Sequence, residues 1–205
     1  MKKKKGYTGR LTAAARRAQL IEIGRTVFAE RGYEATSVEE IAARAKVSKP
    51  ILYGHFGGKE GLYAVVVDRE VEHILNSIAE AVSTGTPRER LEQAALAYLN
   101  YVREHPEGFT ILLRDAPVQN SSLPALMYDL ADRISDVFTE QFGKAGYDSK
   151  SAPIYAHALV GMVAFVGQWW TDSHKPPPVE LVASHIAALA WTGLRHLPKR
   201  PALLA

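Results

Sequence analysis

Residues 48–63, SKPILYGHFGGKEGLY, bring lysines, glycines, tyrosines and a histidine together in one short stretch. Such residues could cradle the phosphates of a nucleotide or contact the backbone of a nucleic acid. A nucleotide-binding P-loop needs glycine, four residues of any type, then Gly-Lys and a hydroxyl residue for magnesium. Here Tyr53 stands where the first glycine is needed, and Glu60 follows Lys59. The stretch is therefore not a P-loop, which leaves a nucleic-acid contact or an ordinary turn between helices.

The rest of the sequence carries no catalytic or metal-binding pattern. There is no cysteine, which excludes disulfides, thiolate metal sites and cysteine nucleophiles. The seven histidines are scattered without HExxH spacing, and neither GxGxxG nor GxSxG occurs. We therefore expect no metal, no cofactor and no enzymatic activity.

The elements that must position this stretch are predicted to be helices. Period-2 alternation is not sustained anywhere, whereas apolar residues recur at three- and four-residue steps between glycines and prolines. The sequence therefore predicts an all-α protein. Nine helices are expected at about residues 10–31, 37–45, 48–56, 59–82, 88–104, 106–115, 126–144, 154–170 and 179–196.

Two of these helices, 37–45 and 48–56, are short and close together. The tight turn at Lys46-Val47 between them gives the length pattern of a helix-turn-helix, whose second helix enters the major groove of DNA. Ser48 can cap that second helix, and Pro50 falls in its first turn, where a missing N–H costs little.

The second short helix would have two unlike sides. At about 100° per residue, the inward side gathers Val47, Ile51, Leu52 and Phe56. The opposite side presents a cation, a rigid proline and an aromatic hydroxyl, at Lys49, Pro50 and Tyr53. These residues suit phosphate and thymine-methyl contacts, so the outer side indicates DNA binding.

Residues 28–63, FAERGYEATSVEEIAARAKVSKPILYGHFGGKEGLY, resemble the TetR family of bacterial transcriptional regulators. They follow its pattern of G-Y, then T-S/T-V-x-x-I-A, then V-S, then L-Y-x-H-F-x-x-K-x-x-L, with every spacing matched. Lys46 departs from the pattern, because the family usually has glycine at this turn; lysine there costs some strain and adds a charge near the DNA. The resemblance implies a DNA-binding head of three helices, residues 1–60, and a six-helix body, residues 61–205, that binds an effector and dimerises.

The resemblance also assigns DNA contacts to the positions that match the motif. Hydroxyls and amides at the start of the second helix would meet a phosphate. The first residues of the third helix would approach base edges, and later ones would bind the backbone. The candidate DNA-binding residues are Thr36, Ser37, Lys46, Ser48, Lys49, Pro50, Tyr53, His55 and Lys59. Two of them have a plainer alternative, since Ser48 could only cap its helix and His55 could only pack in the head.

Charge is divided unevenly along the chain. Residues 1–60 carry 13 Lys and Arg against 6 Asp and Glu, whereas residues 61–205 carry 12 against 16. A basic first part suggests a polyanionic partner such as double-stranded DNA. Lys2 to Lys5 and Arg10 could reach along the DNA backbone or minor groove, or could form a solvated tail.

The body carries two candidate surfaces. An apolar helix of residues 154–170 and the stripe on the last helix would leave a large exposed patch on a monomer, which predicts a homodimer. The candidate interface residues are Tyr155, Leu159, Met162, Val166, Val182, Ile186 and Leu189. An effector pocket, implied by the resemblance, would draw on Tyr98, Tyr101, Phe109, Leu113, Met127, Trp169 and Trp170. Few charges fall among these positions, which favours an apolar or aromatic effector, although each residue could equally belong to the core.

Residues 154–170 also invite a membrane reading, because 17 nearly continuous apolar residues reach the lower limit for a spanning helix. His157 and Gln168 interrupt the stretch, and no basic cluster flanks it closely, so we expect a buried or interface helix and no membrane. No secretion signal is read at the N-terminus, and the lack of cysteine fits a reducing interior, so a cytoplasmic protein is expected.

These features together predict a homodimeric, ligand-responsive repressor that reads a near-palindromic operator. By resemblance, a ligand in the body would shift the fourth helix, alter the separation of the heads and weaken DNA binding. One alternative is an activator, or a regulator without an effector, in the same fold. Another is a helical small-molecule-binding or catalytic protein that has no specific DNA binding.

Overall fold

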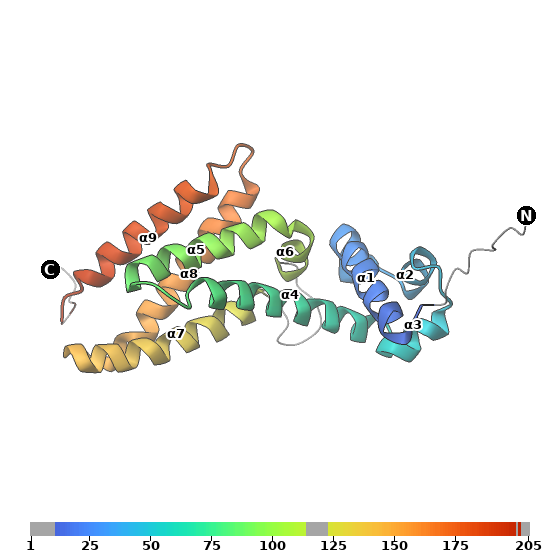
Figure 1. Ribbon diagram of the computed structural model, residues 1–205, viewed down its shortest axis with the longest axis horizontal. Coiled ribbons are helices and arrows are strands. Elements are labelled where there is room, and N and C mark those ends of the chain that lie inside the picture. The colour runs from blue at the N-terminus through green and yellow to red at the C-terminus, as the bar shows by residue number, and fades with distance from the viewer. Residues whose placement is uncertain (1–10, 114–122, 200, 202–205) are drawn as a thin grey trace, which may run out of the picture. The chain divides into compact units, whose positions relative to one another are not determined.

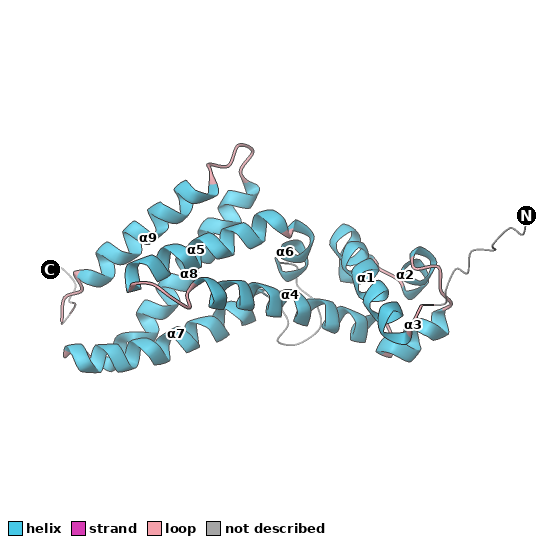
Figure 2. Cartoon of the chain, viewed as in Figure 1, coloured by secondary structure: helices cyan, strands magenta, loops and turns pink. Residues whose placement is uncertain are grey.

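The computed structural model describes residues 11–113, 123–199 and 201 (Figure 1). The basic arm formed by Lys2 to Lys5 and Arg10 lies outside these residues. Within the described part, every regular element is helical and no strand is present (Figure 2). The α-helices are α1 (Ala13–Ala35), α2 (Val38–Arg44), α3 (Lys49–Phe56), α4 (Lys59–Ala81), α5 (Pro87–Glu104), α6 (Pro106–Leu113), α7 (Leu123–Ala145), α8 (Ala152–Asp172) and α9 (Val179–Arg195). The all-α prediction is confirmed, as are nine helices among the described residues.

The chain forms two compact units, Met1–Val67 and Asp68–Ala205. α4 begins in the first unit and ends in the second, so the observed division falls inside this helix, whereas the sequence places it at residues 60 and 61. The first unit is called the head and the second the body below.

In the head, capping and turn residues define the helices. Thr12 caps α1 by accepting a hydrogen bond from the Ala15 amide at 3.1 Å. Gly32, where the sequence predicts a stop, has φ 78°, which breaks the helical path near the end of α1. Gly57 ends α3 in the left-handed conformation, with φ 74°. Both glycines adopt positive φ, a backbone conformation that residues with a Cβ rarely adopt.

The core of the head is apolar and aromatic. Leu20, Ile41, Leu52 and Leu62 have no exposed surface. The ring of Phe28 packs edge-on against that of Tyr63, with centroids 4.9 Å apart. Ile51, which the sequence assigns to the core, is 40% exposed, so that prediction is wrong. Leu52 is the one buried residue of α3, and Phe56, also predicted to face inward, is half-buried.

In the body, α5 packs along α9, and α7 packs along α8 (Figure 1). A capping box starts α5, in which Thr86 Oγ1 accepts from the Glu89 amide and Glu89 Oε2 accepts from the Thr86 amide. α8 passes so close to α5 that a Cβ on Gly167 would lie 2.3 Å from Cε1 of Tyr98. Between the predicted helices 126–144 and 154–170, the connection is shorter than expected, because a 3-10 turn, Ser149–Ser151, leads directly into α8 at Ala152.

One buried polar contact joins the body part of α4 to α5. Glu70 is 7% exposed, and its Oε2 accepts a hydrogen bond from the Tyr101 hydroxyl at 2.7 Å. Gly108 of α6 lies against both groups, since a Cβ there would stand 1.9 Å from Glu70 Oε2. A buried carboxylate is tolerated when hydrogen bonds satisfy it, and this contact fixes three helices at one point.

Candidate nucleic-acid interface

The turn between α2 and α3 closes in a Schellman motif. The Val47 amide bonds to the Ala42 carbonyl at 2.9 Å, and the Lys46 amide bonds to the Ala43 carbonyl at 3.1 Å. Lys46 occupies the left-handed position of this motif, with φ 54°, and is the one non-glycine residue with positive φ among those described. The turn therefore forms without glycine, at the cost of strain on Lys46, whose side chain is exposed.

The outer side of α3 is open to solvent. Lys49 and Pro50 are exposed in its first turn, and Tyr53 follows one turn later with 53% of its surface accessible. Ser48 occupies the predicted N-cap position of α3 and is exposed, but its side chain makes no capping hydrogen bond. Its hydroxyl therefore remains available beside Lys49 at the start of the helix.

The two hydroxyl residues before α2 lie in different environments. Thr36 is 3% exposed, and its Oγ1 donates to the Gly32 carbonyl at 2.6 Å, so its hydroxyl is used inside the head. Ser37 is exposed and accepts from the Glu40 amide at 3.1 Å. Between these two candidates, only Ser37 has its hydroxyl at the surface.

Two cations hold helix ends of the head in place: Arg17, which the sequence does not single out, contacts the end of α3, and Lys59 joins the start of α4 to α1. The guanidinium of Arg17 on α1 lies 4.4 Å from the Phe56 ring centroid, and its Nη1 donates to the His55 carbonyl at 3.1 Å. Nζ of Lys59 donates to the Tyr33 carbonyl at 3.0 Å and lies 4.2 Å from the centroid of the Tyr33 ring. Cations suit a helix C-terminus and aromatic faces. Arg17 therefore holds the end of α3 against α1, and Lys59 holds the start of α4 against the end of α1.

Neither anchor has a local sequence signal, because the partners of Arg17 and Lys59 lie 38 and 26 residues away. His55 is half-buried beside Phe56, which fits a packing role as well as a backbone contact. The structure thus gives Lys59 and His55 a place in the head, and their contacts with phosphate stay predictions.

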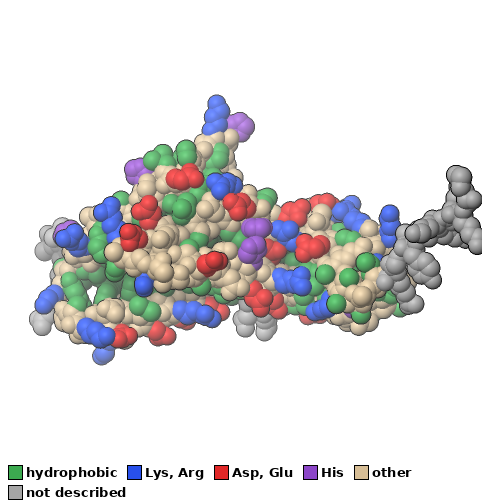
Figure 3. All heavy atoms as spheres, in the orientation of Figure 1, with side chains coloured by type: hydrophobic (Ala, Val, Ile, Leu, Met, Phe, Trp, Pro, Cys, Tyr) green, Lys and Arg blue, Asp and Glu red, His purple; other side chains and the backbone are tan. Residues whose placement is uncertain are grey.

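Acidic residues on α1 and α2 are paired with cations. Arg31 Nε lies 2.9 Å from Glu40 Oε1, and Arg44 Nη2 lies 2.7 Å from Glu30 Oε2. The hydrogen bond from Arg44 holds the pKa of Glu30 below its ordinary value. Glu39 forms an ion pair with Lys49. Basic and acidic side chains lie scattered among apolar ones on the visible face (Figure 3).

The predicted pocket residues divide between interior and surface. Tyr98 and Phe109 are buried, with ring centroids 6.2 Å apart, and burial raises the pKa of the Tyr98 phenol. Leu113 and Trp169 are exposed. The others are Tyr101 and Trp170, both buried, and Met127, which is half-buried. The Trp170 indole donates to the Pro177 carbonyl at 2.8 Å, which ties the end of α8 to the segment before α9. The joint role of the seven residues as an effector pocket stays a prediction.

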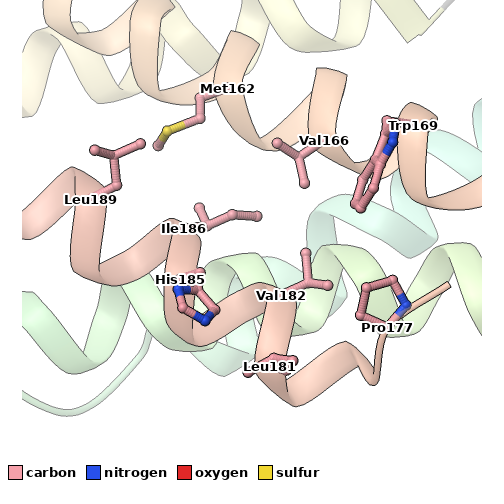
Figure 4. A pocket seen from close by; sticks show the side chains of 9 residues that line it. All are labelled: Met162, Val166, Trp169, Pro177, Leu181, Val182, His185, Ile186 and Leu189. Carbon is pink, nitrogen blue, oxygen red and sulfur yellow. The ribbon is translucent and has the colours of Figure 1, made fainter.

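An apolar groove of about 320 Å³ runs between α8 and α9. Figure 4 shows Met162, Val166 and Trp169 on the α8 side and Val182 and Ile186 on the α9 side. The complete lining is Met162, Val166, Trp169, Pro177, Leu181, Val182, His185, Ile186 and Leu189. This set is called the α8–α9 groove, and it contains five of the seven residues predicted for the dimer interface.

The exposed stripe of α8 lies one residue away from the predicted one. Ile154 and Phe165 are 68% and 78% exposed, whereas Tyr155 and Leu159 are only half-exposed. Tyr155 packs against Phe142 of α7, with ring centroids 5.5 Å apart. The helix from Ser149 to Asp172 is long and apolar enough to cross a membrane by length and composition alone, and 22% of its most apolar window is buried.

Comparison with known proteins settles the family. The sequence model described as "Bacterial regulatory proteins, tetR family" matches residues 20–66. The one described as "Tetracyclin repressor-like, C-terminal domain" matches residues 87–193, which is more than half of the chain. The chain belongs to the TetR family. It is a transcriptional regulator and, like its relatives, not an enzyme.

Three relatives illustrate the range of this family. The HTH-type transcriptional activator FasR of Mycolicibacterium smegmatis is 29% identical over 191 residues, covering 92% of this chain and 87% of that protein. The HTH-type transcriptional repressor KstR2 of Mycobacterium tuberculosis is 30% identical over 115 residues, covering 56% and 57%. A crystal structure of a TetR-like regulator from Rhodococcus sp. RHA1 superposes with a TM-score of 0.72 at 30% identity, covering 92% of this chain and all of that one.

Proposed function

We propose that this TetR-family regulator is a cytoplasmic homodimeric repressor that a small molecule releases from a near-palindromic operator. The observation that supports operator reading most strongly is the outer side of α3, where Ser48, Lys49, Pro50 and Tyr53 are all exposed. Leu52 is fully buried on the opposite side, so the helix is held by its inner face and offers its outer face to the major groove.

The dimer is proposed from the α8–α9 groove and the stripe beside it. Phe165, Trp169 and Leu189 are each more than half exposed, and a soluble monomer rarely leaves such a contiguous apolar surface uncovered. A second copy of the same face is self-complementary in polarity, and a two-fold axis would give two copies of α3 for two half-sites. A second copy of the chain would cover this apolar face, so we propose no contact with a membrane.

Release from DNA by an effector is proposed because the boundary between head and body falls inside α4. α4 belongs to both units, so a movement of its body half reaches the head through a continuous helix. An effector weakens DNA binding only if it binds the DNA-free arrangement more tightly. The aromatic residues among the pocket candidates favour an apolar or aromatic molecule.

Operator binding can be tested by selecting duplexes from a random pool and measuring gel shifts with the winners and with the DNA upstream of the gene. We expect an enriched inverted repeat. Tyr53→Ala should weaken binding to all duplexes alike, because Tyr53 is assigned to phosphates. If no duplex binds above the level of random DNA, the regulator is not an operator-binding protein.

The sign of regulation needs its own experiment, because FasR is named an activator and KstR2 a repressor. Transcription from a template that carries the selected operator, with and without the protein, decides between them. A repressor lowers transcript yield, whereas an activator raises it. A thermal-shift screen with apolar and aromatic metabolites then seeks the effector, and a true effector must also lower operator affinity.

A further inference from the structure

One ion pair crosses between the two helices of the helix-turn-helix. Glu39 is the second residue of α2 and Lys49 the first residue of α3, and the Lys49 ammonium contacts Glu39 Oε1. Both side chains are more than half exposed, at 59% and 53%. The pair therefore sits on the surface, at the same end of α3 as Ser48 and Pro50.

The other acidic residue of this turn of α2 has different partners. Glu40 contacts Arg31 on α1 and Arg44 on its own helix, at 2.9 and 3.0 Å. Those cations do not belong to the reading helix. Glu39 is thus the acidic residue of α2 whose described partner is a predicted base-reading residue.

A carboxylate in this place acts on DNA in two ways. It repels phosphates, and it occupies the ammonium that would otherwise neutralise one of them, so sequence-independent binding loses a contact. An exposed ion pair is weak, so a guanine that offers O6 and N7 can draw Lys49 away from it. The released carboxylate can then accept a hydrogen bond from cytosine N4, a contact that a mismatched site does not provide.

From this arrangement we infer that Glu39 is a specificity-determining residue, which holds Lys49 away from non-operator DNA and releases it at a matched G·C pair. The inference rests on the proposed operator-binding function. The Glu39 carboxylate should weaken binding to every duplex, and should weaken binding to non-operator duplexes most.

The test replaces Glu39 with its neutral isostere in the full-length chain. Glu39→Gln and the wild type are titrated by fluorescence anisotropy with a selected operator and with a shuffled duplex of the same length, at several salt concentrations. We expect the variant to bind the shuffled duplex about 3- to 10-fold more tightly, with a salt slope steeper by up to about one unit. Affinity for the operator should rise less, so the ratio of the two affinities falls.

Two controls separate this role from a change in net charge. Glu22→Gln makes the same charge change at an exposed position of α1 and should shift both duplexes equally. In a Lys49→Gln background, Glu39 no longer has its ammonium partner. Glu39→Gln should then change the ratio of operator to shuffled-duplex affinity no more than Glu22→Gln does. Thermal melting of each variant verifies that the head is folded.

The results separate a failure of the proposed operator binding from a failure of the proposed role of Glu39. If the wild type prefers no selected duplex over the shuffled one, the operator-binding function fails, and the inference fails with it. If the wild type is specific but Glu39→Gln keeps its affinity ratio and salt slope, only the role of Glu39 is overturned. An equal effect with and without Lys49 also overturns it, since Glu39 would then act through its charge alone.

Discussion

The head and the body expose their working surfaces in opposite ways. The head buries most of its apolar core, including Leu20, Ile41 and Leu62, and presents polar groups, such as Lys49 and the Tyr53 hydroxyl, on one short helix. The body leaves apolar side chains outside, with Phe165 78% exposed and Leu189 67% exposed. A polar surface is stable in water on a single chain, whereas a large exposed apolar surface usually marks a site that another molecule covers. The difference fits the proposal that the outer side of α3 reads DNA and that the α8–α9 face assembles a dimer.

The largest effect is expected from charged residues introduced into the apolar face of α8 and α9. Phe165→Glu combined with Leu189→Glu should convert the dimer into a monomer, because each interface would bury uncompensated carboxylates. Operator affinity should fall about 100-fold, since two linked heads bind far more tightly than one. Sedimentation velocity and anisotropy titration measure the two effects.

Val137→Glu serves as the control for that pair. Val137 is 57% exposed on α7 and does not belong to the α8–α9 groove, so its substitution should leave both the dimer and the operator affinity unchanged. A double variant that stays dimeric in solution would show that α8 and α9 do not form the interface.

A second prediction concerns the interior of the body, where α8 meets α5. Gly167→Ala should lower the free energy of unfolding by about 1–3 kcal/mol, because its Cβ would lie 2.3 Å from the buried Tyr98 ring. Gly161→Ala on the same helix meets nothing within 4 Å and should not destabilise the protein. Chemical denaturation of both variants makes the comparison, and equal stabilities would show that α8 is not held this closely.

Two tyrosines of α5 provide a third, matched test. Tyr98 and Tyr101 are both buried, but the Tyr101 hydroxyl donates to Glu70, whereas the Tyr98 hydroxyl has no partner among the described residues. Tyr101→Phe should cost about 1–3 kcal/mol of unfolding free energy, and Tyr98→Phe should add about 1 kcal/mol. Thermal unfolding with calorimetry measures both.

Tyr98 also bears on the effector. If its hydroxyl faces the effector, Tyr98→Phe will stabilise the free protein yet lower effector affinity. A Tyr98→Phe variant that is less stable than the wild type would mean that the hydroxyl has a partner after all.

The smallest predicted effect lies in the head. Lys46→Gly should raise the free energy of unfolding by about 0.5–1 kcal/mol, because glycine relieves the left-handed strain but costs more chain entropy. Ala43→Gly, three residues earlier in ordinary helical conformation, should destabilise by a similar amount. Urea denaturation that shows the same sign for both variants would mean that the turn is not strained.

The sequence predicts the head better than the body for a physical reason. Caps and turns are set by neighbours in the chain, so Pro50 and Gly57 mark the ends of α3 correctly, and Gly32 marks the break in α1, which continues to Ala35. Contacts between distant residues have no such local mark, and the pairing of Lys59 with Tyr33 could not be read in advance.

The phase of α8 shows the same limit in the body. A helix that is apolar on every side carries no periodic signal, so the sequence selects Tyr155 and Leu159 where the structure exposes Ile154 and Phe165. Burial of Tyr98 and exposure of Trp169 likewise depend on which helices pack together. Periodicity alone therefore identifies apolar helices without showing which residues face a ligand, a core or a partner.

The most direct measurement is the stoichiometry of the protein on a selected operator, obtained by sedimentation or native mass spectrometry. A homodimeric operator-binding regulator should select an inverted repeat with half-sites about one helical turn apart and bind it as two copies of the chain. A single chain on an unrepeated site, or no enriched sequence at all, would contradict it.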